Sequence, residues 1–387
     1  MILELTQSLS QRIYYFCNMF LTHLSLINFK NCTDISVNLN QSVNCFLGDN
    51  GEGKTNLLDA IYYLSNTKSY FNSIDSQNVK FGEPFFVAQG EFSRNEETTN
   101  IYCGVKKGAK KQFKFNKKNY TKLAEHIGKF PVVIITPYDS NLILEGSETR
   151  RKFLDRLISQ FNKAYLDNLI SYNKLLSHRN ATLKQMAENQ SFNADFLAVI
   201  DFQLVEKGNF VHEERKQFLE EFIPVFNRFY NDISNRKEAV SLTYTSTLND
   251  NSFEQLLKEN IRKDRAVTYT TKGVHRDDLE FKIRGDYSLK KFASQGQQKS
   301  FLMALKLAQF EYIKQKKGFS PILLLDDIFD KLDESRVNYI LQMIAQNKLG
   351  QTFITDTSLT KSSEILTQLN VDFKAFKIKN GGLEELL

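Results

Sequence analysis

A glycine-rich run near the start of the chain is the clearest candidate for a chemical function. It reads GDNGEGKT and fits the pattern G-x-x-x-x-G-K-[ST], in which backbone N–H groups converge on phosphates and a lysine reaches the β- and γ-phosphates. An apolar segment precedes it and an amphipathic segment, residues 56–64, follows it, although a glycine-rich turn can match the pattern by chance. The residues predicted to hold a bound nucleotide here are Gly48, Asp49, Asn50, Gly51, Glu52, Gly53, Lys54, Thr55 and Asn56.

Two carboxylates follow an apolar run late in the chain. Residues 322–325 read ILLL and are followed directly by Asp326 and Asp327. Ligand sites of α/β proteins lie at the carboxyl ends of strands, so Asp326 is predicted to hold Mg²⁺ together with the hydroxyl of Thr55. Asp327 is predicted to orient or deprotonate an attacking water, with Lys54 as the second catalytic residue. A buried strand that ends in an acidic turn is common, and only the phosphate loop favours the catalytic interpretation.

A third segment could bind an anion at the start of a helix. Residues 292–298 read FASQGQQ and open a helical pattern that runs over residues 294–316. Ser294 is a plausible N-cap whose hydroxyl, with the free N–H groups at Gly296 and Gln297, would form a second anion site. An ordinary helix start explains the same residues.

Lysines gather in one predicted β-hairpin. Alternation over residues 85–120 predicts antiparallel strands, which would place many of these lysines on one solvent face where DNA phosphates could bind. An exposed edge hairpin that uses lysines against aggregation is the alternative. Arg150, Arg151 and His275 have similarly open roles. The lysines are Lys106, Lys107, Lys110, Lys111, Lys114, Lys117, Lys118 and Lys122.

The patterning along the chain predicts an α/β protein that leaves its nucleotide-binding lobe and returns to it. The spacing at which apolar residues recur changes from every second residue to about every 3.6 residues near residue 148, which predicts a helical region. Within it, the apolar faces of residues 196–205 suggest a packed antiparallel bundle. Strands are predicted again at residues 240–245, 266–269 and 279–283. The expected division is an N-terminal extension at 1–18, the first part of the ATPase lobe at 19–147, a helical lobe at 148–265 and the rest of the ATPase lobe at 266–387.

Composition narrows the class of protein. With 387 residues, 41% hydrophobic and 25% charged, the chain can bury a core in more than one lobe, so disorder and fibrous folds are excluded. A net charge of +6 permits a polyanionic partner. The four cysteines show no metal-like spacing, and no segment predicts a membrane span or signal peptide, so we expect a cytoplasmic protein.

These motifs together resemble a known family. The S-x-G-Q segment, the acidic strand end and a Leu332–Asp333 pair resemble the signature, Walker B and D-loop of ABC-type ATPases. Within them the chain most resembles the RecF family of DNA replication and repair proteins, through residues 24–31, 48–56, 136–155 and 273–279 and a short helical insert. An Asp at position 327, where SMC-type and transporter ATPases usually carry Glu, points the same way.

The resemblance implies a P-loop ABC-type ATPase head with an antiparallel β subdomain and a helical second lobe. It also implies that ATP and Mg²⁺ bind between two subunits, with Ser294, Gly296 and Gln297 of one subunit facing the phosphate loop of the other. Lys30 and Asn31 are candidates for the adenine contact, or else form a solvated turn. The chain departs from the pattern in its ASQG signature, in Val274 where proline is usual, and in lacking a histidine after residues 352–355, where Thr355 or Asp356 stands.

By the same resemblance, the expected function is a weak, DNA-stimulated ATPase of recombinational repair and replication. It would dimerise on ATP to clamp duplex DNA near gaps, release the DNA on hydrolysis, and act with RecO- and RecR-like partners. The alternative is an ABC-type ATPase subunit that acts on a protein partner, such as a transporter, without binding DNA. A scaffold that does not hydrolyse ATP is a further possibility.

Overall fold

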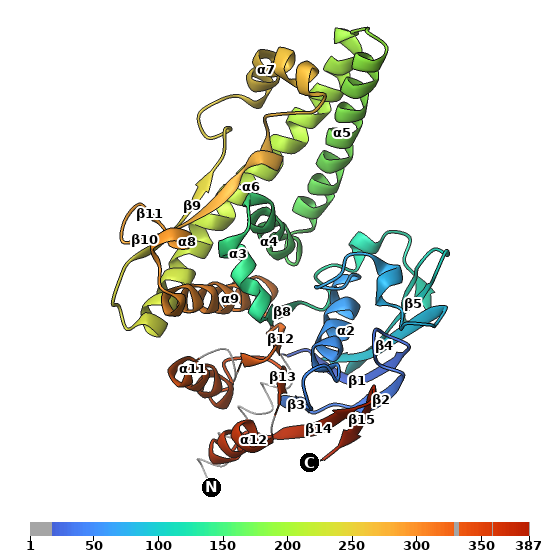
Figure 1. Ribbon diagram of the computed structural model, residues 1–387, viewed down its shortest axis with the longest axis vertical. Helices are drawn as coiled ribbons and strands as arrows, with labels where there is room; N and C mark the ends of the chain where they lie inside the picture. Colours follow the sequence, from blue (N-terminus) through green and yellow to red (C-terminus); the bar gives the residue numbers. More distant parts are fainter. Residues whose placement is uncertain (1–17, 329–332, 358, 387) are drawn as a thin grey trace. The chain divides into compact units, whose positions relative to one another are not determined.

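The computed structural model describes residues 18–328, 333–357 and 359–386, which form two compact units. The first unit contains the described residues up to Asp139 and those from Leu305 onward, and the second is Ser140–Ala304 (Figure 1). The expected extension at 1–18 lies outside the described residues except for Asn18, whose side-chain oxygen accepts a hydrogen bond from the Ser320 N–H.

A mostly parallel sheet forms the centre of the first unit. Its strands are short and apolar, and β3, β8, β12 and β13 are buried at every position, as expected for parallel strands covered on both faces. An antiparallel strand, β15, closes one edge. In spatial order the strands are β15 (Gly382–Glu385), β14 (Phe373–Lys379), β3 (Val43–Leu47), β13 (Thr352–Asp356), β12 (Ile322–Leu325) and β8 (Val132–Ile135).

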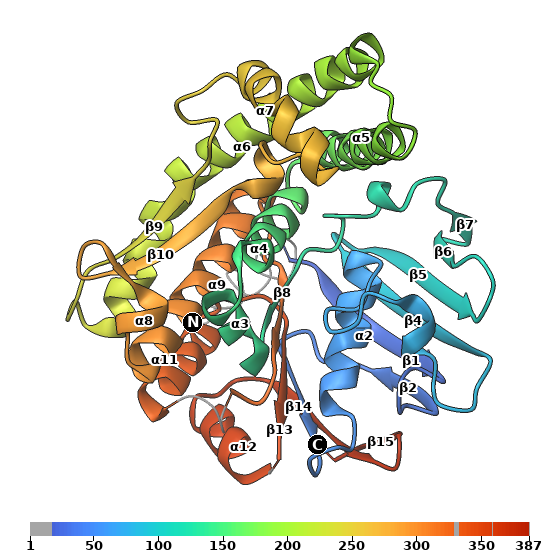
Figure 2. The same ribbon diagram turned by 45° about the horizontal axis from the view of Figure 1, so that its top comes forward.

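A six-stranded antiparallel sheet supplies the β subdomain of the same unit. Alternation between buried and exposed residues along its strands leaves one face for the core. Helix α2 (Lys54–Asn66) lies against this sheet (Figure 2). It contributes Leu57, Ile61 and Leu64 to the core. In spatial order the strands are β2 (Asp34–Asn38), β1 (Phe20–Ile27), β4 (Phe85–Arg94), β5 (Glu97–Lys106), β6 (Gln112–Phe115) and β7 (Lys118–Asn119).

Long helices dominate the second unit. Helix α5 (Lys163–Glu188) packs along α6 (Ala194–Ser234), which spans 41 residues and continues through Pro224. Helix α7 (Phe253–Val267) packs on both. The remaining elements are α3 (Asn141–Leu144), α4 (Ser147–Ser159), α8 (Leu289–Phe292) and a sheet in the order β11 (Tyr287–Ser288), β10 (Asp278–Ile283) and β9 (Val240–Thr245).

Helix α9 (Gln295–Lys317) belongs to both units, because the boundary between Ala304 and Leu305 falls within it. Helices α11 (Glu334–Ala345) and α12 (Leu359–Gln368) complete the first unit. The α/β class and most predicted elements are thus present, including the helix expected at 294–316 and the strand expected at 322–325.

Three expectations differ from the structure. Residues 266–269 do not form a strand, because the amphipathic pattern of α7 continues to Val267 and ends at Thr268 with φ near 61°. The apolar face of residues 196–205 is only partly packed, since Phe196 and Phe202 are 50% and 77% exposed. Residues 266–304 belong to the second unit rather than to the ATPase lobe, because β10 pairs with β9.

Candidate nucleotide-binding site

The phosphate loop connects β3 to α2 in the first unit. Helix α2 has Gly53 at its N-cap with φ of 105° and no side-chain cap, so the N–H groups of Lys54 and Thr55 donate to no acceptor in the described part of the chain. The φ at Gly53 favours glycine, and a Cβ there would lie 2.3 Å from the Asn31 side chain, which would have to move. The helix start therefore offers uncapped N–H donors and a partial positive charge to an anion.

Lys54 lies folded over this loop. Its ammonium group donates to the carbonyl oxygens of Gly48 and Asp49, at 2.7 and 3.1 Å, and the residue is 5% exposed. Backbone carbonyls are weak partners for a full charge compared with phosphate oxygens. The lysine is thus held at the loop, where a phosphate would give its charge a better acceptor.

The predicted metal ligands, Thr55 and Asp326, lie in contact. The Thr55 hydroxyl donates to Asp326 Oδ1 at 2.8 Å, and the hydroxyl of Thr355 donates to the same oxygen at 2.9 Å. Burial raises the pKa of the Asp326 carboxyl, while these two hydroxyl donors lower it. A nearby cation would oppose the effect of burial and favour the charged form.

Asp327 has an unusual backbone and an unsatisfied carboxylate. Its φ is 49°, a left-handed conformation that Asp tolerates better than most residues, and its N–H donates to the Thr355 hydroxyl at 2.9 Å. Among the described residues, its buried Oδ1 has no hydrogen-bond partner. A buried acceptor without a partner needs one, and a water would satisfy it.

Thr355 at the end of β13 therefore bridges both aspartates. Parallel pairing of β13 with β12 brings Thr355 beside the acidic strand end. The sequence placed Thr355 or Asp356 at this position without a role. Hydroxyl geometry of this kind depends on strand register, which the sequence did not predict.

Lys30 and Asn31 have internal partners in the structure. Lys30 lies 2.7 Å from the buried Asp59 of α2. Asn31 donates to the Glu52 carbonyl and accepts from the Asn56 amide, both at 2.7 Å, which ties the phosphate loop to the start of α2. An adenine contact by either residue stays a prediction, and the positioning of the loop by Asn31 was missed by the sequence.

The signature residues lie in the second unit. The Ser294 hydroxyl accepts from the Gln297 N–H at 3.2 Å, while the Gln297 side chain accepts from the Ser294 N–H at 2.7 Å, a reciprocal cap at the start of α9. Gln297 also donates to Glu238 at 2.8 Å. Ser294 is exposed and Gly296 half-buried, so the anion site that they are predicted to form stays a prediction. Of the predicted D-loop pair, Leu332 lies outside the described residues, and Asp333 caps α11.

Comparison with known proteins decides the family. Residues 20–381 match the family model described as the RecF/RecN/SMC N terminal domain. The DNA replication and repair protein RecF of Flavobacterium johnsoniae is 50% identical over 360 residues, which cover 93% of this chain and 100% of that protein. RecF of Bacteroides fragilis is 45% identical over 369 residues, 95% of this chain and 99% of that protein.

The chain belongs to the RecF family.

Solved structures agree with this assignment. The structure of "the recombination mediator protein RecF-ATP in RecFOR pathway" superposes with a TM-score of 0.88 at 32% identity, over 96% of this chain and 99% of that one. The corresponding RecF-ATPrS structure gives a TM-score of 0.86 at 31% identity, over 97% of this chain and 100% of that one. A Smc head domain from Pyrococcus furiosus shares the fold. Its TM-score is 0.55 at 14% identity, over 95% of this chain and 96% of that one.

The basic hairpin of this RecF-family chain is present, but two of its lysines have internal contacts. Lys111 lies 2.9 Å from Asp75 and donates to the Thr67 carbonyl at 2.6 Å, and Lys114 lies over the ring of Tyr102. The other six lysines are exposed and surround β6 and β7. They are Lys106, Lys107, Lys110, Lys117, Lys118 and Lys122.

Arg150 and Arg151 have partners within the second unit rather than a free surface. Arg150 pairs with Asp278 through two nitrogens at 2.7 and 2.9 Å, and Arg151 donates to the Asp277 carbonyl at 2.6 Å. His275 is equally internal, because its Nε2 lies 3.0 Å from the Thr270 carbonyl and must donate to it. Burial lowers the pKa of His275 to about 4, so it is neutral at physiological pH.

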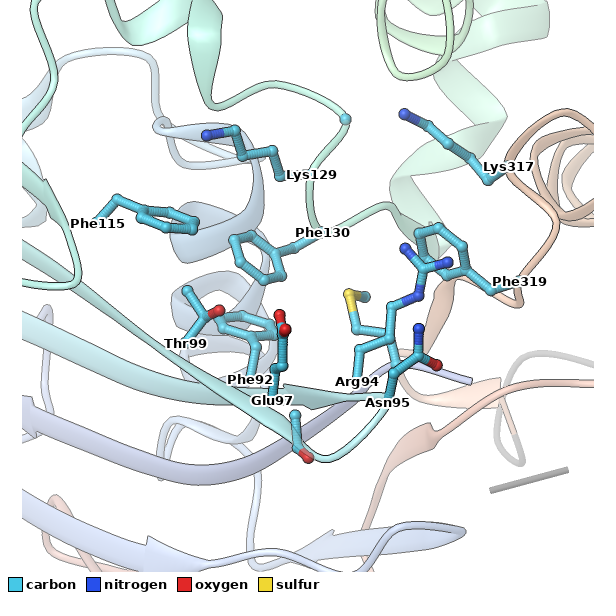
Figure 3. A pocket seen from close by; sticks show the side chains of 13 residues that line it. Phe92, Arg94, Asn95, Glu97, Thr99, Phe115, Lys129, Phe130, Lys317 and Phe319 are labelled. Carbon is cyan, nitrogen blue, oxygen red and sulfur yellow. The ribbon is translucent and has the colours of Figure 1, made fainter. Parts of the chain in front are cut away.

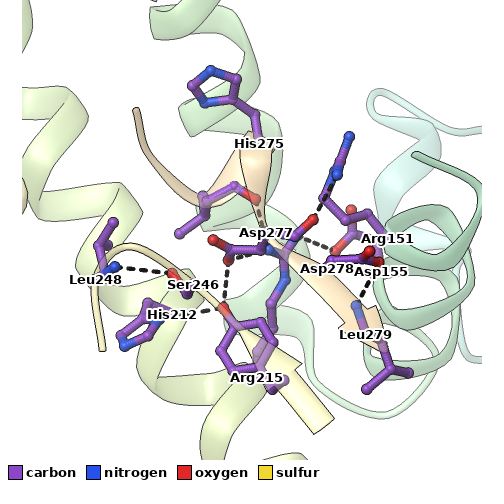
Figure 4. Close-up of polar contacts among 12 residues, drawn as sticks. Arg151, Asp155, His212, Arg215, Ser246, Leu248, His275, Asp277, Asp278 and Leu279 are labelled. Atoms are coloured by element: carbon purple, nitrogen blue, oxygen red, sulfur yellow. Dashed lines mark hydrogen bonds and ion pairs between the residues drawn. The ribbon is translucent and has the colours of Figure 1, made fainter. Parts of the chain in front are cut away.

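These contacts surround a buried arginine. Arg215 of α6 lies between Asp155 and Asp277, at 2.8 and 2.9 Å, as Figure 4 shows. It also donates to the Val274 carbonyl at 2.9 Å. The motif at residues 273–279 therefore anchors β10 to the helices.

Among the described residues, no helix combines the length and apolar character that a bilayer span requires.

Proposed function

We propose that this RecF-family protein is an ATP-dependent DNA-binding ATPase of recombinational DNA repair and replication. The observation that carries the proposal is the contact of Thr55 with Asp326 beside an uncapped glycine-rich loop. The names of the similar RecF proteins, and the RecF-ATP structure of the RecFOR pathway, support the same function.

The loop residues bind and position the nucleotide. N–H groups at the start of α2 would hold the phosphates, and Lys54 would exchange its two carbonyl partners for phosphate oxygens. The oxygens of Thr55 and Asp326 suit Mg²⁺, which favours one or two carboxylates together with substrate phosphates. When bound, Mg²⁺ would neutralise charge that develops on the phosphates.

Hydrolysis needs a positioned water. The unsatisfied Oδ1 of Asp327 provides an acceptor for one, and its backbone is fixed by the Thr355 hydroxyl. Asp327 would orient this water or take its proton. Lys54 would stabilise the charge on the transferred phosphate.

The nucleotide would act as a clamp between two copies of the chain. Ser294 and Gly296 of one protomer would complete the ATP site of its partner, and the exposed lysines near β6 and β7 would contact duplex DNA near gaps. ATP favours the closed dimer only through the additional contacts made there. The protein would act in the cytoplasm with RecO- and RecR-like partners, and DNA would stimulate its weak hydrolysis.

Binding of duplex DNA at one fixed salt concentration, with and without ATP, tests this proposal. Asp327→Asn should bind ATP, dimerise and hold DNA more tightly than the parent, because it hydrolyses ATP slowly. Lys54→Ala should lose nucleotide-dependent dimerisation and the ATP effect on DNA binding. Dimer mass measured by light scattering on the same samples separates the two steps.

Two outcomes would contradict the proposed clamp. Binding of DNA that ignores ATP in the parent and in Asp327→Asn would remove the clamp. Dimerisation of Lys54→Ala with ATP like that of the parent would show that the phosphate loop does not drive closure.

A further inference from the structure

A second pocket lies in the first unit, away from the phosphate loop. It has a volume of about 500 Å³ and is lined mainly by the β4–β5 turn, residues 128–130 and residues 317–319 (Figure 3). Phe130 and Phe319 precede β8 and β12, so the pocket adjoins the amino ends of these parallel strands. The nucleotide site lies at the carboxyl ends of the same sheet, which makes the two sites separable by experiment.

Three cations line the pocket and one carboxylate, Glu97, accompanies them. The side chains of Arg94, Lys129 and Lys317 form no ion pair or hydrogen bond with any residue that the structure describes, and two of them contact aromatic rings instead. Partial burial and the nearby charge of Arg94 lower the pKa of Lys317. Like charges that line one pocket without an ion-pair partner favour an anion, since each would gain from a negative group placed near it.

Two of these cations are held in place by aromatic rings. The Arg94 guanidinium lies 3.8 Å from the centre of the Phe319 ring, and the Lys129 ammonium lies 4.4 Å from that of Phe115 (Figure 3). A guanidinium that stacks on a ring still directs its N–H donors outward in its own plane. The cations are therefore oriented before any ligand arrives, which lowers the entropy cost of binding.

The floor of the pocket is apolar. Phe92 and Phe130 pack against each other with ring centres 4.2 Å apart, and Met19 lies beside them in the lining. An apolar side chain that enters here would remain close to the cations around it. Buried aromatic anchors with charged groups at their edge are typical of peptide recognition.

We propose that this pocket binds an acidic peptide segment of a partner protein that ends in, or contains, a large apolar side chain. The apolar side chain would occupy the floor formed by Phe92, Phe130 and Met19. Carboxylates of the segment would pair with Arg94, Lys129 and Lys317.

A nucleic acid ligand fits these observations less well. Bases bind single-strand sites by stacking on free aromatic faces. Here Arg94 and Lys129 lie over one face each of Phe319 and Phe115, and Phe92 and Phe130 are buried against each other. The pocket offers cations and an apolar floor, but Phe92, Phe130 and Phe319 are buried, so they expose little ring surface on which a base could stack.

Fluorescence anisotropy with a dye-labelled peptide, Asp-Glu-Asp-Glu-Leu-Phe with a free carboxylate, tests the proposal on the full-length protein. Saturable binding is expected with Kd below about 100 µM at physiological salt. Replacing Leu and Phe by Ser, or the acids by their amides, should each weaken binding at least about fivefold. Arg94→Ala should weaken it by a similar factor, and Arg94→Lys by less.

Lys122→Ala is the matched control, because it removes one exposed charge outside the pocket and should leave peptide binding unchanged. Binding of labelled ATP, unaltered in Arg94→Ala, would establish that the variant is folded. Absence of saturable binding at 1 mM peptide, about the limit of weak association, or equal binding by Arg94→Ala and Lys122→Ala, would overturn the proposal. Displacement of the peptide by a single-stranded oligonucleotide at equal concentration would overturn it in favour of a nucleotide ligand.

Discussion

At the scale of single residues, the proposed nucleotide site contains one hydroxyl, that of Thr355, which belongs to none of the sequence motifs. Thr355 donates to Asp326 and accepts from the Asp327 N–H, so it sets the position of both carboxylates. Because Asp327 has a left-handed φ, this second hydrogen bond helps to hold a backbone conformation that is costly for a residue with a side chain. Thr355 is a positioning residue in this arrangement.

Thr355→Val should slow ATP hydrolysis at least about tenfold while ATP affinity changes less than about threefold. Valine keeps the shape of threonine but removes the hydroxyl, so the loop and Lys54 remain intact while Asp327 loses its anchor. Single-turnover hydrolysis and equilibrium ATP binding, measured on the same variant, separate the two effects.

Thr352→Val is the control on the same strand. Its hydroxyl donates only to the Gly350 carbonyl among the described residues, and it is as buried as Thr355. If both variants hydrolysed ATP at the rate of the parent, Thr355 would have no positioning role. Serine at position 355 should restore most of the rate.

At the scale of elements, buried polar groups join segments that the sequence leaves far apart. Arg215 connects α6 to Asp155 of α4 and to Asp277 next to β10. Arg215 and Asp277 are buried and Asp155 is partly exposed. The buried charges are tolerated because each is paired, and removal of one partner leaves the other without compensation.

Arg215→Met should destabilise the second unit by about 3–5 kcal/mol, since Asp155 and Asp277 would lose their cation inside the unit. Thermal unfolding followed by circular dichroism measures this loss. Lys216→Met, at the neighbouring and exposed position, should change stability by less than about 1 kcal/mol. A similar small change in both variants would contradict the structural role of Arg215.

His126 joins the segment after β7 to the end of α2. Its Nε2 lies 2.7 Å from the Leu64 carbonyl and donates to it, while Nδ1 accepts from the Tyr120 hydroxyl at 3.0 Å. Burial lowers the pKa of His126 to about 4. The neutral ring is therefore the form that the folded protein requires.

Acid should weaken the first unit through this histidine. The unfolded chain takes up its proton near pH 6.5, whereas the folded protein resists until about pH 4, so stability is complete above pH 6.5 and falls between these values. Two to three units of pKa correspond to about 3 kcal/mol. Urea unfolding at pH 7.5 and 4.5 should show a smaller loss in His126→Gln, but not in the exposed His178→Gln. If the parent, His126→Gln and His178→Gln lost equal unfolding free energy between pH 7.5 and 4.5, the pKa of His126 would not be lowered by folding.

At the scale of the whole molecule, periodicity and motifs predicted most of the fold. Strands 43–47 and 322–325 and the helix after the phosphate loop were recoverable because a buried parallel strand is a short apolar run and the glycine pattern is specific. The false strand at 266–269 came from a short run that a helix end can equally contain. The partners of Arg150, His275 and Lys111 could not be predicted, because they join residues that are distant in sequence.

The proposed dimer makes its own prediction at this scale. If each ATP contacts the phosphate loop of one protomer and the signature of the other, two inactive variants should restore activity when mixed. Lys54→Ala lacks a working loop, and Ser294→Arg places a bulky cation at the signature. In a mixed dimer one site combines the intact loop of the second variant with the intact signature of the first.

An equimolar mixture should therefore hydrolyse ATP clearly faster than either variant alone, because Lys54→Ala does not close a dimer with itself, whereas each mixed dimer has one working site. Each variant alone should show almost none. The double variant mixed with the parent is the control: its mixed dimers have no working site, so only dimers of two parent chains hydrolyse ATP, and the rate falls below the half expected if each chain completed its own site. Failure of the two single variants to complement, with both shown to dimerise with the parent, would mean that each chain completes its own site and that ATP does not bridge two copies.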